Sequence, residues 1–187
     1  MLTRKTVLAH SNFIADADME TIKEKGAGIA HCPLSNFFFS DAVFPLRRAL
    51  EKGLRVGMGT DISGGPSASI LDTCRSSIFA SRLLENGVDP EKPASTRGTP
   101  KSRTDFREAF YLATAGGADV LDLPVGRFET GCHFDAILVD PQAEVAPIYI
   151  DEELDKPDDV AQKLVMLATR SNFSTVWVDG IATGSVT

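Results

Sequence analysis

The first part of the chain repeats one pattern three times: a short apolar run, a polar residue at its end, a loop and an amphipathic segment. Short apolar runs of this length are typical of buried strands, and amphipathic segments are typical of helices that cover a sheet. Consecutive strand–helix units require a parallel sheet with right-handed crossovers, so the predicted fold class is α/β. The predicted strands cover residues 6–10, 28–31 and 54–61, and the helices end at Gly26, Gly53 and near Gly87.

The pattern changes after the third unit. Residues 88–103 are polar and contain three prolines, which predicts a surface loop. Helical spacing of apolar residues then predicts a helix capped by Thr104 and closed by Gly116 and Gly117. A short helix is expected around residues 118–121.

The tail of the chain is rich in β-prone residues. Two such runs, residues 134–140 and 175–178, lie on either side of a helix predicted near residues 158–169. We therefore predict two parts, residues 1–130 and residues 131–187, of which the second contributes strands to a small β element.

Composition and charge exclude several classes of protein. Nineteen basic and 26 acidic residues give a net charge of −7, which disfavours nucleic acid as a partner. No apolar stretch approaches the roughly 18 residues of a membrane span, and the first residues lack the apolar stretch of a signal peptide. We expect a cytoplasmic protein with no membrane partner. The widely spaced Cys32, Cys74 and Cys132 are expected to be reduced thiols in packed positions.

Three side chains able to bind a metal or move a proton stand at the ends of the predicted strands: His10, His31 and Asp61. The carboxyl ends of parallel strands meet at one edge, where active sites are built. Two imidazoles and a carboxylate are a ligand set that zinc favours. Taken singly, each histidine is more often a hydrogen-bonded structural residue than a ligand, and Asp61 is more often a helix cap. Their common position at consecutive strand ends favours a site.

Other notable residues are less informative. His133 has no partner group near it in the sequence, so we predict no catalytic role, and we expect Cys32 to pack rather than react. The glycines between Gly59 and Gly65 match no phosphate-binding pattern and are expected to permit a tight turn beside a planar ligand. The three phenylalanines at 37–39 fit either stacking on a ligand or an apolar plug under a loop.

Three segments together resemble the metal-dependent amidohydrolase superfamily: residues 7–11 (VLAHS), residues 29–36 (IAHCPLSN) and residues 57–61 (GMGTD). They look like strands 6, 7 and 8 of that superfamily. The resemblance implies that residues 1–130 are the C-terminal part of a TIM-type (β/α)8 barrel and that residues 131–187 are a tail belonging to a small composite β domain. Such a barrel usually takes about 250 residues, more than this chain has.

The resemblance also implies roles for individual residues. Asp61 matches the aspartate that binds zinc and helps take a proton from the attacking water, and His10 matches a histidine beside that water. His31 and Asn36 match a string whose role looks architectural. The implied reaction is hydrolytic deamination of the purine guanine to xanthine and ammonia by zinc-activated water. Hydroxytriazines and nucleosides are alternative substrates in similar enzymes.

The superfamily's site also uses a His-x-His pair, a further strand-end histidine and a glutamate that shuttles a proton. None of these matches a residue of the 187 here, whose remaining histidine is His133. The chain alone is therefore expected to bind zinc weakly and to be inactive. The alternative is a non-catalytic fragment or interaction module. In either case the exposed edge of the first strand is expected to pair with another copy or with a partner chain.

Overall fold

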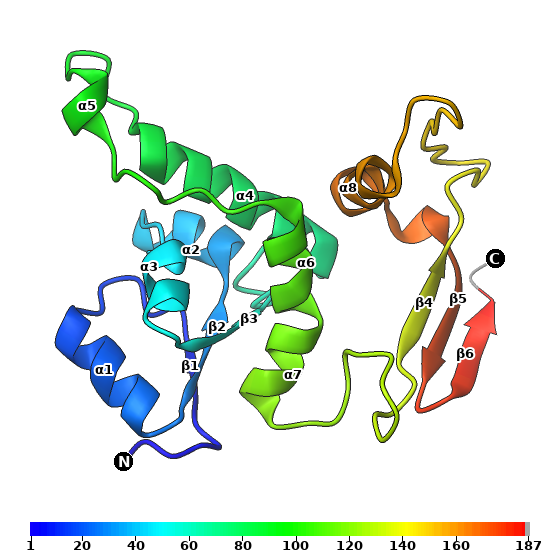
Figure 1. Ribbon diagram of the computed structural model, residues 1–187, viewed down its shortest axis with the longest axis horizontal. Helices are drawn as coiled ribbons and strands as arrows, with labels where there is room; N and C mark the ends of the chain where they lie inside the picture. Colours follow the sequence, from blue (N-terminus) through cyan, green and yellow to red (C-terminus); the bar gives the residue numbers. More distant parts are fainter. Residues whose placement is uncertain (186–187) are drawn as a thin grey trace. The chain divides into compact units, whose positions relative to one another are not determined.

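A computed structural model describes residues 1–185 (Figure 1). The chain divides into two compact units, Met1–Leu123 and Pro124–Thr187. Within the described residues, no helix has both the length and the apolar character needed to cross a membrane.

The first unit is built on a parallel sheet. Its strands are β1 (Val7–Ala9), β2 (Gly28–His31) and β3 (Arg55–Met58), in the order β1-β2-β3. Both neighbouring pairs are parallel, and the register aligns Leu8 with Ile29 and Ile29 with Val56. The predicted succession of strand–helix units is therefore confirmed, with strands slightly shorter than predicted.

The first unit also contains seven helices, of which α5 lies away from the sheet, beyond α4 (Figure 1): α1 (Asp16–Glu24), α2 (Pro33–Ser40), α3 (Leu46–Glu51), α4 (Ile70–Asn86), α5 (Ala94–Arg97), α6 (Phe106–Ala113) and α7 (Ala115–Leu121). Helix α4 begins after Ser69, whose hydroxyl accepts a hydrogen bond from the backbone N–H of Asp72. Helix α6 is capped by Asp105 rather than Thr104. The Asp105 carboxylate accepts a hydrogen bond from the backbone N–H of Glu108, and the Glu108 carboxylate accepts one from the backbone N–H of Asp105.

Three features of this unit differ from the prediction. Helix α2 follows β2 directly, since Pro33 occupies its first turn, where no backbone donor is needed. One turn of helix, α5, lies inside the segment predicted as a loop. Gly116 and Gly117 do not close α6 but lie within α7, where they let the helix approach β3.

The hydrophobic core lies between one face of the sheet and the helices α1, α3 and α6. Leu8, Ile29 and Val56 share this face because side chains alternate along a strand. Helix α1 buries Met19 and Ile22 against it, at the spacing of one helical turn. The buried residues of this core are Met19, Ile22, Ala27, Ile29, Phe44, Leu46, Ala49, Leu54, Val56 and Leu112.

The opposite face of the sheet carries small residues and is approached by α7. A Cβ atom on Gly57 of β3 would lie 2.8 Å from the Cα of Gly117, and one on Gly28 of β2 would lie 2.8 Å from Val120 Cγ1. The absence of side chains at Gly28 and Gly57 thus allows α7 to pack directly on the two strands.

The second unit combines an antiparallel sheet with a helix (Figure 1). Strands β4 (Ala136–Val139), β5 (Phe173–Val178) and β6 (Ile181–Ser185) are antiparallel in the order β4-β5-β6. Helix α8 (Pro157–Leu167) and the short 3-10 turn η1 (Arg170–Asn172) precede β5. The predicted runs and the helix between them are observed, whereas β6 was not predicted.

Candidate active site at the ends of the parallel strands

His10 directly follows β1 and has a left-handed backbone conformation. Its φ is 65°, and that of the next residue, Ser11, is 55°. The His10 backbone N–H still donates to the carbonyl of Ala30, at 3.0 Å, so the residue remains tied to β2. Left-handed backbone costs on the order of 1–3 kcal/mol for a residue with a side chain and is concentrated at functional sites. The imidazole of His10 therefore points in a direction that it would not take if β1 continued through this residue.

Asp61 follows β3 and is also left-handed, with a φ of 50°. The chain then turns back so tightly that a Cβ atom on Gly65 would lie 2.1 Å from the carbonyl oxygen of Thr60. A Cβ atom on Gly64 would come within 2.9 Å of Asp61 Oδ2. The two glycines thus permit the close turn and leave the carboxylate uncovered, as the sequence predicts.

The two turns bring the side chains of His10 and Asp61 together. His10 Nε2 lies 3.7 Å from Asp61 Oδ2, and the side chains are 40% and 37% exposed. That distance is longer than the roughly 2.7–3.2 Å of a direct hydrogen bond. A carboxylate and an imidazole nitrogen therefore face each other across a short gap that solvent or a ligand can reach.

Asn36 holds the other side of the His10 ring. Its Oδ1 lies 2.9 Å from His10 Nδ1, and the residue is 1% exposed in α2. The Asn36 Nδ2 is buried and has no hydrogen-bond partner among the described residues. An unsatisfied buried donor costs about 1–3 kcal/mol. Placing Asn36 beside His10 therefore lowers the stability of the folded chain.

His31 does not join His10 and Asp61, so the three strand-end side chains do not form one ligand set among the described residues. His31 is 2% exposed, with Nε2 3.2 Å from Ser77 Oγ and its ring 5.2 Å from that of Phe44. Burial lowers the pKa of His31 to about 3, so its ring is neutral at physiological pH. His31 thus acts as a core residue, in line with the architectural role that the resemblance implies.

Cys32 lies near this site without having the properties of a reactive thiol. It is 4% exposed, and its Sγ is 3.4 Å from the carbonyl oxygen of Ala30. Burial and the negative charge of Asp61 raise the pKa of the Cys32 thiol. A protonated, enclosed thiol is a poor nucleophile, which supports the packing role expected for Cys32.

Two of the three phenylalanines of α2 are not an apolar plug. Phe38 and Phe39 are 75% and 66% exposed, and their rings contact each other edge to face, with centroids 4.9 Å apart. They present aromatic surface to the solvent, whereas Phe37 is partly buried.

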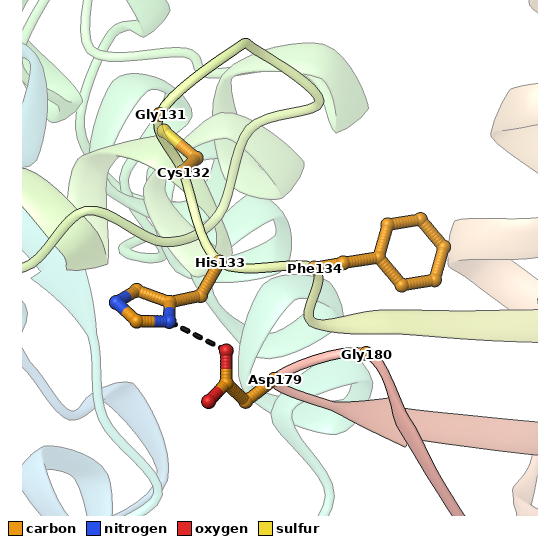
Figure 2. A pocket seen from close by; sticks show the side chains of 6 residues that line it. All are labelled: Gly131, Cys132, His133, Phe134, Asp179 and Gly180. Carbon is orange, nitrogen blue, oxygen red and sulfur yellow. Dashed lines mark hydrogen bonds and ion pairs between the residues drawn. The ribbon is translucent and has the colours of Figure 1, made fainter.

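The third histidine lies in the second unit, beside a shallow pocket of about 340 Å³ (Figure 2). His133 Nδ1 is 2.6 Å from Asp179 Oδ1, and this bond raises the pKa of His133. The pair connects the segment before β4 to the turn between β5 and β6. Its contacts are those of a surface ion pair, and the absence of a catalytic role for His133 stays a prediction.

The donor atoms at the strand ends are of the kinds that bind a metal ion. Asp61 offers a carboxylate and His10 an imidazole nitrogen, and both suit zinc. Residues 1–185 contain no group of three or more histidine, cysteine, aspartate or glutamate side chains placed to hold one ion. Since zinc sites use three or four protein ligands, these two residues fit the ion but do not complete its site.

The fold and the candidate site described above agree with one class of protein. The chain belongs to the amidohydrolase family, whose model matches residues 1–182. This membership confirms the resemblance noted in the three strand-end segments.

Within that family, the chain is similar to guanine deaminases. It is 36% identical to the guanine deaminase of Mus musculus and 37% identical to that of Homo sapiens, over 185 residues each. Each alignment covers 96% of this chain and 38% of the relative. The chain thus spans little more than a third of the length of these relatives.

Solved structures agree with this relationship. The guanine deaminase of E. coli superposes with a TM-score of 0.80 at 28% identity, covering 97% of this chain and 39% of that one. The enzyme from C. acetobutylicum, solved with guanine in its active site, gives a TM-score of 0.77 at 26% identity, covering 95% and 38%. The fold is therefore that of a part of an amidohydrolase barrel with an appended β element, as predicted.

Proposed function

We propose that this chain is the part of a guanine deaminase that carries the last strand ends of the catalytic barrel, and that the whole enzyme converts guanine and water to xanthine and ammonia. The observation that supports this most directly is the approach of His10 Nε2 to Asp61 Oδ2, 3.7 Å apart, at the carboxyl edge of the sheet. In parallel α/β folds this edge is where substrates bind.

The two side chains have different tasks in this proposal. The Asp61 carboxylate accepts a proton from the attacking water and is a ligand of the metal. The His10 imidazole faces the same gap and would stabilise the water as it adds to C2 of guanine, because the Nε2 electron pair can accept a hydrogen bond from that water. Both side chains are partly exposed, so water and a planar base can reach them.

The proposed cofactor is zinc, which lowers the pKa of bound water and so supplies a nucleophile near neutral pH. Asp61 would hold it, with His10 beside it. A structural neighbour, the atrazine chlorohydrolase of Arthrobacter aurescens, was solved with zinc, at 24% identity and a TM-score of 0.74. The ligands and the proton-shuttling glutamate that this chain does not contain belong to the rest of the barrel in this proposal.

A chimera tests the proposal. Residues 1–187 are joined to the part of the Mus musculus guanine deaminase that precedes its matching region, and xanthine formation and zinc content are measured. We expect an active, zinc-containing chimera and no xanthine formation by the 187-residue chain alone. A folded chimera that holds zinc but deaminates only a nucleoside or a hydroxytriazine would replace guanine as the substrate, and one without any activity would favour a non-catalytic role.

The remaining expectations concern cellular location and domain organisation. We propose a cytoplasmic location, which fractionation of cells expressing a tagged chain would test. We also propose that residues 1–130 belong to the barrel and residues 131–187 to a composite β domain. Apolar side chains exposed on the second sheet support this, since they leave surface for further strands to cover: Ile137, Leu138 and Val178 are 50%, 54% and 54% exposed.

A further inference from the structure

Asn36 contacts the imidazole of His10 from the side opposite Asp61. The Asn36 Oδ1 is 2.9 Å from Nδ1 of the ring, while Asp61 Oδ2 is 3.7 Å from Nε2. Asn36 is 1% exposed and its position is fixed by α2, whereas the His10 side chain is 40% exposed. The rigid, buried amide therefore determines how the more exposed ring is held.

An amide oxygen can only accept a hydrogen bond, so the nitrogen facing it must carry the proton. In its neutral form, the His10 ring then has its proton on Nδ1 and a free electron pair on Nε2, directed toward Asp61. Two acceptors facing each other across 3.7 Å repel unless a cation or a donor lies between them. Asn36 thus prepares the gap for a positively charged or proton-donating group.

We propose that Asn36 is a positioning residue, which fixes His10 in the Nδ1–H tautomer and holds Nε2 toward Asp61. The geometry that supports this is the 2.9 Å separation of Asn36 Oδ1 and His10 Nδ1. Residue 36 has no capping role in α2, whose N-cap is Cys32, and its buried side chain makes no bond other than the one to His10 among the described residues.

If the Asn36 amide had the opposite orientation, the His10 ring would be in the other tautomer. With Nδ2 toward the ring, Nδ1 would accept and Nε2 would carry the proton, and His10 would then donate to Asp61. A donating Nε2 would be drawn to the carboxylate at hydrogen-bond distance, whereas the observed separation is 3.7 Å. The two orientations can be distinguished because they place the proton on different nitrogens.

The tautomer can be measured on the 187-residue chain itself, without metal or substrate. Long-range ¹H–¹⁵N correlation spectra of ¹⁵N-histidine-labelled protein at pH 8 report which ring nitrogen is protonated. We expect protonated Nδ1 in the parent and in Asn36→Asp, which keeps an acceptor. Asn36→Leu, of similar size but without an acceptor, is expected to shift His10 toward the Nε2–H form.

The signals of His133, which lies in the second unit, serve as an internal reference that none of these substitutions changes. Protonated Nε2 in the parent, or an unchanged His10 spectrum in a folded Asn36→Leu, would overturn the proposal. If Asn36→Leu fails to fold, Asn36→Asp and Asn36→Ala give the same comparison, because only the first retains an acceptor.

The catalytic consequence of this assignment rests on the proposed function. In the active chimera we expect Asn36→Leu to lower kcat by roughly 10- to 100-fold with KM changed much less, and Asn36→Asp to restore part of the loss. A loss confined to KM would contradict a positioning role in catalysis. An inactive parent chimera together with the Nδ1–H tautomer would reject the proposed function and leave the role of Asn36 supported.

Discussion

Gly57 and Gly117 pack so closely that a Cβ atom on Gly57 would lie 2.8 Å from the Cα of Gly117. Strand β3 and helix α7 therefore meet backbone against backbone. The relationship is not symmetrical, because a Cβ atom on Gly117 would meet nothing closer than the Leu112 carbonyl oxygen at 3.4 Å. The same substitution at the two positions should thus have opposite effects.

We expect Gly57→Ala to destabilise the first unit by about 1–3 kcal/mol, because the added methyl forces α7 away from the sheet. Gly117→Ala is the matched control and should be neutral or stabilise by up to about 1 kcal/mol, through helix propensity. Urea unfolding followed by circular dichroism measures both. Equal losses at the two positions would mean that α7 does not pack on Gly57 as described.

Burial of His31 predicts a loss of stability in mild acid. Its folded pKa of about 3 lies below the unfolded value near 6.5, so the unfolded chain takes up the proton first as the pH falls. The part of the free energy of unfolding that depends on a neutral His31 is complete above pH 6.5 and declines toward pH 3. At pH 5 the loss is about 2 kcal/mol.

This dependence can be isolated with the double substitution His31→Leu/Ser77→Ala, which removes the imidazole and its hydroxyl partner together. The free energy of unfolding of parent and variant is measured at pH 7 and pH 5. We expect the parent to lose about 2 kcal/mol more than the variant over this range. Parallel pH profiles would show that His31 is accessible to protons in the folded state.

Alanine substitutions of Asp61 and of His133 should have very different effects on the active chimera. We expect Asp61→Ala to remove bound zinc and to lower kcat/KM by roughly 10²–10⁴-fold, since it deletes a metal ligand and a proton acceptor. His133→Ala removes only an exposed ion pair with Asp179 and should stay within about twofold, because such pairs contribute little. Similar losses from both substitutions would refute the assignment of Asp61.

The free edge of β1 predicts association of the isolated chain. Strand β1 pairs only with β2 among the described strands, and Val7 is 40% exposed. Light scattering should show self-association that increases with concentration, and Val7→Lys should reduce it by placing a charge on the edge strand. Val88→Lys, at a 77% exposed loop position, is the control and should change nothing. A monomeric parent at high concentration would contradict this prediction.

Much of the fold was predictable because its elements follow local rules. The strand Gly28–His31 is as predicted from its apolar run, and the Ser69 cap of α4 follows ordinary capping chemistry. Helix α2 was missed, because Pro33 suggests a break where it is tolerated as a first-turn residue, and because Phe38 and Phe39 point to solvent rather than forming an inward stripe.

The site was predictable only in part. His10 and Asp61 were identified from their position at strand ends, but their approach depends on left-handed backbone that no sequence pattern indicated. His31 was grouped with them although alternation along β2 places it on the same face as buried Ile29. That parity was the available signal that His31 belongs to the core.

The left-handed backbone of His10 and Asp61 has a consequence for the stability of this rim. Glycine adopts such a conformation without strain, so at both positions the side chain that can exchange a proton is present where glycine would relieve the backbone. In the proposed function, the rim thus keeps two reacting side chains at a cost in stability. His10→Gly and Asp61→Gly would each remove one of these side chains and relax the turn that carries it.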